Sequence, residues 1–126
     1  MQFGGVMLRF LFVLFLSLLP LRATATPEAL SAAIAALGDR DYGLAALERA
    51  RITDPSAADV VTWIRLRQGE GLMQEYVDFL DRNGDWPGLP YLIRMGERNI
   101  PEDAAPEAVL AYFDRQLPQT GWGSLR

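Results

Sequence analysis

The sequence contains no cysteine, no histidine and no lysine, although it is 126 residues long. Without cysteine the chain cannot form a disulfide, a thiolate metal site or a lipid-modified N-terminal cysteine. Histidine is the side chain most used for acid–base chemistry and is a common metal ligand, and lysine is required for Schiff-base chemistry. These absences predict a protein that holds no metal and no cofactor.

Lysine is replaced entirely by arginine, and acidic residues outnumber the arginines. The formal net charge is −4, with 12 basic and 16 acidic residues. The arginines are scattered along the chain, and scattered arginines on an acidic domain do not make a basic patch. We therefore expect no nucleic-acid partner and no binding to an anionic membrane surface.

Two adjacent carboxylates, Glu102 and Asp103, are a candidate metal pair. Calcium takes about six to eight oxygen ligands, and no further oxygen ligands lie at a fixed spacing around this pair. We interpret them as charges that precede a helix beginning at Pro106. The chain also lacks a phosphate-binding loop, a nucleophile elbow and a dinucleotide fingerprint.

The first 25 residues have the organisation of a secretory signal peptide. Arg9 supplies the positive charge, residues 10–21 form an apolar core, and Ala23 and Ala25 make a small-x-small cleavage site. A core of about 12 residues spans about 18 Å as a helix, which is less than the roughly 30 Å of membrane hydrocarbon. We expect cleavage after Ala25, a periplasmic location and no stable membrane anchor. An uncleaved anchor or a buried N-terminal helix is the alternative.

Residues 26–126 are predicted to form one all-α domain. Apolar residues recur at helical spacing, and no segment alternates with the period of two that marks a strand. Thr26 stands where a helix cap is expected, and Asp41 and Asp54 stand where the next two helices are expected to begin. Six helices make three antiparallel pairs, which can stack as an α-solenoid or close as a plain helical bundle. The predicted helices cover about 27–37, 41–51, 55–68, 72–82, 89–99 and 106–117.

Two of these helices have side chains with specific expected contacts. In the second helix, Leu44 and Leu47 are expected to pack closely against a neighbouring helix. In the fourth, Asp78 and Arg82 lie four residues apart and are expected to form an ion pair on the outer face. The apolar stripe of the fourth helix is the strongest in the chain and comprises Leu72, Met73, Tyr76, Val77 and Leu80, with Phe79 beside it.

A stiff corner joins the fourth and fifth predicted helices. Gly84 can close the first of them in the left-handed conformation, and Pro87 and Pro90 fit only near the first turn of the second. Trp86, Pro87 and Gly88 form the structural corner itself. We interpret Trp86 as a packing residue between the two helices, with ligand stacking as the alternative.

The corner belongs to a series of residues that matches a known family. In order, these residues are Phe79-Leu80, the segment 85–90 (Asp-Trp-Pro-Gly-Leu-Pro), Arg94 and Glu97 on the following helix, Val109 to Phe113, and Thr120-Gly121. The series resembles the N-terminal helical region of soluble lytic transglycosylases, periplasmic enzymes that cleave the glycan strands of peptidoglycan. The resemblance covers about residues 40–123 and implies a curved solenoid of helix pairs.

The resemblance implies a non-catalytic function for this chain. The chain would be the N-terminal helical scaffold of a lytic transglycosylase, either a truncated product or a fragment, with the catalytic domain absent. Peptidoglycan would then be a partner only through the parent enzyme. A free-standing periplasmic helical-repeat module that binds a protein partner is the alternative.

No residue of the chain is expected to be catalytic. In the family the catalytic glutamate is followed by serine in a separate lysozyme-like domain, and none of the seven glutamates here precedes serine. All seven are predicted to lie at caps or on polar faces, as Glu97 would with Arg94 and Arg98, where no apolar pocket raises a pKa. The string at 71–74 (Gly-Leu-Met-Gln) matches one that follows the family's catalytic glutamate, but we interpret it as coincidence because it opens an amphipathic helix.

The last predicted helix, 106–117, carries more apolar surface than one neighbouring helix can cover. The side chains expected to face inward are Val109, Leu110, Phe113 and Leu117, with Tyr112 at the border. A terminal solenoid repeat needs a polar outer face to remain soluble. We therefore expect self-association through this uncapped helix.

Overall fold

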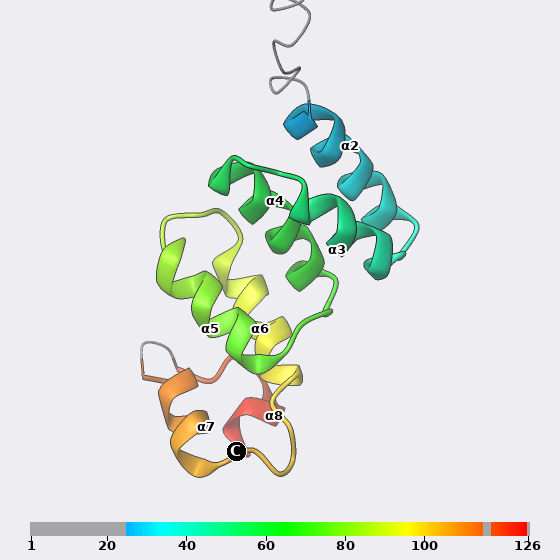
Figure 1. Cartoon of the computed structure of the whole chain (residues 1–126). Helices are drawn as coiled ribbons and strands as arrows, with labels where there is room; N and C mark the ends of the chain where they lie inside the picture. Colours follow the sequence, from blue (N-terminus) through cyan, green and yellow to red (C-terminus); the bar gives the residue numbers. More distant parts are fainter. Residues whose placement is uncertain (1–24, 115–116, 126) are drawn as a thin grey trace, which may run out of the picture.

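A computed structural model of the chain describes residues 25–114 and 117–125, and Figure 1 shows their arrangement. All regular elements in these two ranges are helices, which confirms the predicted all-α class. The helices are α2 (Ala25–Gly38), α3 (Tyr42–Ala50), α4 (Pro55–Arg67), α5 (Met73–Arg82), α6 (Leu89–Arg98), α7 (Pro106–Tyr112) and α8 (Gly121–Ser124).

Aspartates begin α3 and α4, as predicted. The Asp41 carboxylate accepts a hydrogen bond from the Leu44 N–H at 3.0 Å, and the Asp54 carboxylate accepts one from the Ser56 N–H at 2.7 Å. Each bond satisfies a backbone donor that a helix start leaves without an intrahelical partner. These two helix starts are therefore fixed by local sequence.

The prediction that Thr26 caps the first helix is wrong. Helix α2 already begins at Ala25, and the hydroxyl oxygens of Thr26 and Thr53 lie 2.8 Å apart. Thr26 thus ties the start of α2 to the loop before α4. The predicted signal peptide up to residue 24, including Ala23, lies outside the described residues. Among the helices that the structure does describe, none has the length and apolar character needed to cross a membrane.

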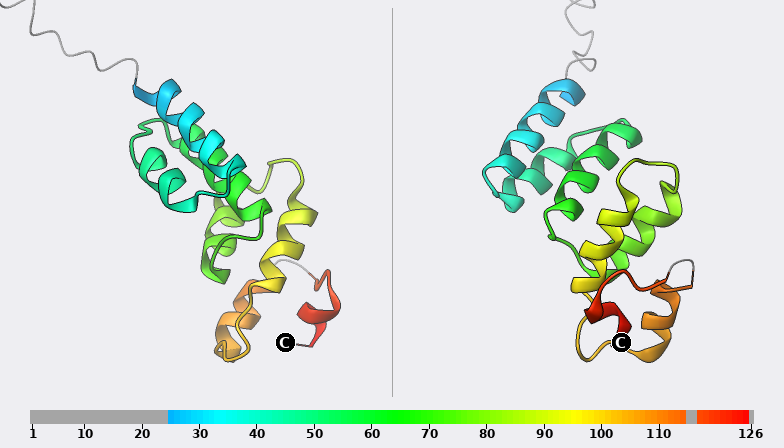
Figure 2. Two further views of the ribbon diagram at one scale, coloured as in Figure 1. Left: turned by 90° about the vertical axis from the view of Figure 1, so that its right-hand side faces the viewer. Right: turned by 180° about the vertical axis from the view of Figure 1, so that it is seen from behind.

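The helices follow one another along the molecule. Helix α2 packs against α3 and α4, α4 packs against α6, and α5 packs against α6 and α7. Figures 1 and 2 show α2 at one end of the molecule and α7 with α8 at the other. The alternate helices α2, α4 and α6 therefore contact each other in chain order.

The buried side chains form two apolar cores, and α4 contributes to both of them. The first core contains Ala29, Ala33, Ala36, Leu37, Ala45, Ile52 and Val61. The second contains Leu66, Tyr76, Phe79, Leu92, Ile100, Val109 and Tyr112. The first is rich in alanine, which lets α2 and α3 approach closely, whereas the second is built around large rings. Helix α4 is thus the element that joins the two halves of the molecule.

Two predictions of inward-facing residues are wrong for physical reasons visible in the packing. In α3 the buried residue is Ala45, while Leu47 is 69% exposed and Leu44 is exposed as well. The small Ala45 side chain allows a close approach to α2 that a leucine at the contact would prevent. In the predicted fourth helix, Leu72 lies at the N-cap position before α5 and is exposed, whereas Tyr76 and Phe79 are fully buried.

The last long helix is shorter than predicted, and only part of its predicted inward face is buried, since Val109 and Phe113 pack in the second core as expected. Helix α7 ends at Tyr112, which is buried in the second core and whose hydroxyl donates to the Ile93 carbonyl oxygen at 2.9 Å. Leu110 and Leu117, which were predicted to face inward, are 72% and 80% exposed. The expected self-association remains a prediction, now with Leu110 and Leu117 among the exposed apolar side chains.

Candidate functional site

The corner between α5 and α6 is built from backbone turns. The Trp86 N–H donates to the Asn83 carbonyl at 3.1 Å, just after α5 ends. Gly88, with φ of 74°, is the N-cap of α6, and Pro90 lies in the first turn of that helix. A left-handed N-cap favours glycine, and a proline is tolerated in a first turn because its missing N–H is not needed there. The left-handed glycine of the corner is therefore Gly88, so the prediction of that conformation for Gly84 is wrong.

The ring of Trp86 lies against aromatic side chains of α4 and α5. Its centroid is 5.3 Å from that of Phe79 and 6.1 Å from that of Trp63, both in edge-on arrangements. The Arg67 guanidinium lies 4.6 Å from the Trp63 ring centroid, and its Nη1 would be 2.6 Å from a Cβ placed on Gly88. Edge-on aromatic pairs of this kind add to apolar burial. The contacts favour packing over ligand stacking as the role of Trp86.

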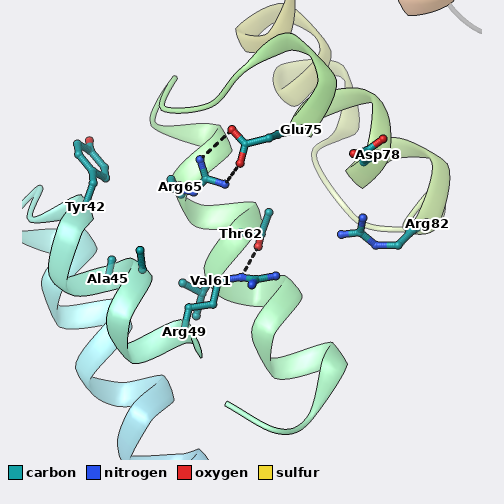
Figure 3. A pocket seen from close by; sticks show the side chains of 10 residues that line it. Tyr42, Ala45, Arg49, Val61, Thr62, Arg65, Glu75, Asp78 and Arg82 are labelled. Atoms are coloured by element: carbon teal, nitrogen blue, oxygen red, sulfur yellow. Dashed lines mark hydrogen bonds and ion pairs between the residues drawn. The ribbon is translucent and has the colours of Figure 1, made fainter. Parts of the chain in front are cut away.

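A polar groove lies between α3, α4 and α5, and Figure 3 shows it from close by. Its volume is about 520 Å³, within the size range of small-ligand sites. The lining side chains are Tyr42, Ala45, Ala46, Arg49, Val61, Thr62, Arg65, Glu75, Asp78 and Arg82. Three arginines and two carboxylates thus meet over a partly apolar floor.

Arg65 and Glu75 form the ion pair at one end of this groove. The Arg65 Nη2 lies 2.6 Å from Glu75 Oε1, and its Nη1 also donates to the Glu70 carbonyl at 2.8 Å. The hydrogen bond from Arg65 holds the pKa of Glu75 below its usual value, and the Leu72 N–H acts in the same direction against the effect of burial. The positive charge of Arg49 adds a smaller effect of the same sign. Glu75 is therefore a charged partner of Arg65, without the raised pKa of a general acid.

Arg82 does not pair with Asp78, so the predicted ion pair four residues apart is wrong. Its Nη2 lies 3.0 Å from Asp59 Oδ1 on α4, and the Asn83 amide donates to the other oxygen of Asp59 at 3.2 Å. Asp78 instead accepts a hydrogen bond from the Gln74 amide at 2.9 Å. Asp59 is more buried than a carboxylate on the outer face of α5, so it offers Arg82 a less solvated partner.

Arg49 is the one arginine in the groove that has no carboxylate partner among the described residues. Its Nε donates to the Thr62 hydroxyl at 2.8 Å, and that hydroxyl donates to the Ala58 carbonyl at 3.3 Å. The position of the guanidinium is therefore fixed through Nε, and its two terminal nitrogens are left for other acceptors. Figure 3 shows the Arg49 and Arg82 guanidinium groups directed into the same space.

Glu97 is fully buried, so its predicted place on a polar face is wrong. Its carboxylate accepts hydrogen bonds from the Gln119 backbone N–H and, at 2.6 Å, from the Thr120 hydroxyl. A Cβ on Gly123 would lie 2.5 Å from Glu97 Oε2, so glycine is needed for α8 to approach α6 this closely. Glu97 thus fastens the C-terminal segment to α6 and is closed to any substrate.

The contact joins two distant residues, since Glu97 and Thr120 are 23 residues apart in the chain, and no pattern of neighbouring residues indicated it. The candidate metal pair is a different case, because Glu102 and Asp103 are both exposed. Nowhere in 25–114 and 117–125 do three potential metal-ligating side chains gather.

Comparison of the sequence with models of protein families finds no match, and comparisons with curated proteins and with solved structures find none either. The functional assignment therefore depends on the residues themselves and on their geometry.

Proposed function

We propose that residues 26–126 form a non-catalytic helical scaffold, the N-terminal segment of a periplasmic lytic transglycosylase that acts on peptidoglycan. The observation that carries this proposal is the convergence of the residues on which the resemblance is based. They are spread over the chain from 79 to 121, yet they meet in the second half of the molecule. A shared role in packing these helices would explain why residues so far apart in the chain occur in the same order as in the transglycosylase region.

Three contacts make up this convergence. Phe79 packs edge-on against Trp86 at 5.3 Å. Glu97 accepts the hydrogen bond of the Thr120 hydroxyl at 2.6 Å. Tyr112, from the matching segment 109–113, donates to a carbonyl of α6 at 2.9 Å. Each contact holds α5, α7 or α8 against the corner or against α6, so these members of the series hold successive helices in place.

We further propose that the helices stack as an α-solenoid. Helices α2, α4 and α6 begin at residues 25, 55 and 89, at a spacing within the usual range of about 20–45 residues for solenoid repeats. They contact each other in order, and α5 contacts α7 in the same way. A plain bundle would gather its helices around one core, whereas this chain has two cores joined by α4.

Lack of catalytic activity in the isolated chain is the first consequence to test. Glu97 is sealed from solvent and Glu75 is held by Arg65, so neither can act as a general acid on a glycan. We expect the purified protein to release no anhydro-muropeptides from isolated sacculi, as measured by chromatography and mass spectrometry. A catalytic lytic transglycosylase serves as the positive control. Release above the buffer blank would contradict the proposal.

Export to the periplasm is the second consequence. The predicted signal peptide should be removed after Ala25, because small residues at positions 23 and 25 suit signal peptidase. N-terminal sequencing of the periplasmic protein should read Thr26-Pro27-Glu28. Protein that retains Met1 in this fraction would contradict the proposed processing.

The free-standing interaction module remains the second candidate, and the polar groove is the observation that favours it. A groove with fixed arginines offers a binding surface that a purely structural segment does not need. The two candidates predict different coding sequences downstream of Arg126. A scaffold segment requires a catalytic domain there, whereas a free-standing module does not.

A further inference from the structure

We propose that the groove between α3, α4 and α5 binds a short peptide or amino acid that carries both a free carboxylate and a free ammonium group. This inference is independent of the proposed scaffold function, because it depends only on side chains that line the groove. It assigns the carboxylate to Arg49 and Arg82 and the ammonium group to Asp78.

The carboxylate end is defined by two guanidinium groups. Arg49 is held through Nε by Thr62 and has no carboxylate partner among the described residues, so both terminal nitrogens can donate. Arg82 is held at one nitrogen by Asp59, which leaves its remaining donors available. Figure 3 shows both groups reaching into one space from α3 and α5. Guanidinium groups fixed in this way lose little freedom when they bind a carboxylate.

The ammonium end is defined by Asp78 on the α5 wall. Its Oδ1 accepts a hydrogen bond from the neutral Gln74 amide, and no ion pair neutralises it within the described parts of the chain. Asp78 lies one helical turn before Arg82 on the same helix, and both line the groove. A ligand with charges of both signs can therefore pair with Arg49, Arg82 and Asp78 at the same time.

The same charges disfavour a phosphate or sulfate ion. Such a ligand would satisfy the arginines, but it would also bring a dense negative charge towards Asp78 and Glu75 on the α5 side of the groove. Like charges placed together cost affinity and so provide discrimination. The remaining lining includes Ala45, Ala46 and Val61, whose small apolar surfaces leave room for an aliphatic side chain.

Trialanine is a suitable probe, because its chemical variants remove one charge at a time. Binding can be followed by NMR titration of ¹⁵N-labelled protein, using the Nε–Hε signals of Arg49 and Arg82 and the backbone signal of Asp78. We expect saturable shifts with trialanine and binding about tenfold weaker or more with trialanine amide, which lacks the carboxylate. N-acetyltrialanine, which lacks the ammonium group, should also bind more weakly, and inorganic phosphate should bind more weakly than trialanine.

Protein variants test the assignment of each charge. Arg49→Gln should weaken trialanine binding about tenfold, whereas Arg98→Gln, on an exposed site of α6 outside the groove, should leave it within about twofold. Asp78→Asn should weaken the binding of trialanine but not that of N-acetyltrialanine. The amide spectrum of each variant shows whether it is folded, and Arg82→Gln replaces Arg49→Gln if the latter is not.

Three results would overturn the proposal. The first is the absence of saturable shifts at Arg49 and Arg82 with trialanine. The second is phosphate binding as tight as that of trialanine. The third is an equal effect of Arg49→Gln and Arg98→Gln on trialanine binding in folded proteins. That result would show that trialanine responds to the positive charge of the surface in general and does not bind in the groove.

Discussion

Replacing Tyr76 with alanine is expected to lower the free energy of unfolding by about 3–5 kcal/mol, the range typical of removing a large buried ring. Tyr76 is fully buried, and a Cβ on Gly96 would lie only 2.9 Å from its ring, so α5 and α6 meet at this side chain. Its hydroxyl donates to the Leu66 carbonyl at 2.8 Å and accepts from the Asn99 amide at 3.1 Å. Burial raises the pKa of Tyr76 from 10 to about 12, so this donor stays protonated at an alkaline pH where an exposed tyrosine ionises.

Urea denaturation followed by far-UV circular dichroism measures this loss, and Tyr91 provides a matched control. Tyr91 is 39% exposed, and its ring contacts Arg67 and Arg94 only at 5.2 and 5.6 Å from the ring centroid. Tyr91→Ala should cost about 1–2 kcal/mol at most, the value of two exposed cation–π contacts. Equal destabilisation by the two variants would show that Tyr76 is not the junction of α4, α5 and α6.

Replacing Glu97 with alanine is expected to release the C-terminal segment from α6. The change leaves the Gln119 N–H and the Thr120 hydroxyl without their buried acceptor. Hydrogen bonds to charged groups contribute about 1.5–3 kcal/mol each, so the loss of these two should be about 3–6 kcal/mol. Because α8 packs against α6 alone among the described helices, the loss should be local, with amide hydrogen exchange in residues 121–125 about a hundredfold faster.

Hydrogen exchange read by mass spectrometry or NMR resolves this effect from global unfolding. Glu97→Gln keeps one acceptor oxygen and should give an intermediate rate. Glu107→Ala is the control, because Glu107 is exposed in the first turn of α7 and should change stability by about 0.3–1 kcal/mol. If the exchange of residues 121–125 is the same in Glu97→Ala and Glu107→Ala, the buried carboxylate does not hold α8.

Features that depend on neighbouring residues could be predicted from the sequence. The helix starts at Asp41 and Asp54 and the proline in the first turn of α6 each follow from the conformational preferences of one or two residues. The all-helical class follows in the same way from the spacing of apolar residues. In these cases the local preference and the tertiary structure agree.

Features that depend on distant residues could not be predicted. Arg82 has a local candidate partner in Asp78, but its actual partner, Asp59, lies 23 residues earlier on α4. Glu97 looks like a surface residue because it is charged, and only the approach of Thr120 and Gly123 makes it a buried one. A helical pattern gives the direction of a side chain relative to its own helix, and it cannot say which element covers that direction.

The groove is the clearest case of this limit. Arg49, Arg65 and Arg82 come from three different helices and look like a scattered solvated set in the sequence. The packing of α3 and α5 on either side of α4 is what brings them together. No pattern of neighbouring residues indicated either the groove or the contact between Glu97 and Thr120.

The most direct test of the scaffold function is the sequence of the genomic DNA downstream of the codon for Arg126. If the chain is the N-terminal scaffold of a lytic transglycosylase, this DNA should encode further helix pairs and then a domain with a Glu-Ser pair and a second Gly-Leu-Met-Gln string. Downstream DNA that encodes no such domain would contradict the scaffold function and leave the free-standing interaction module as the function of the chain.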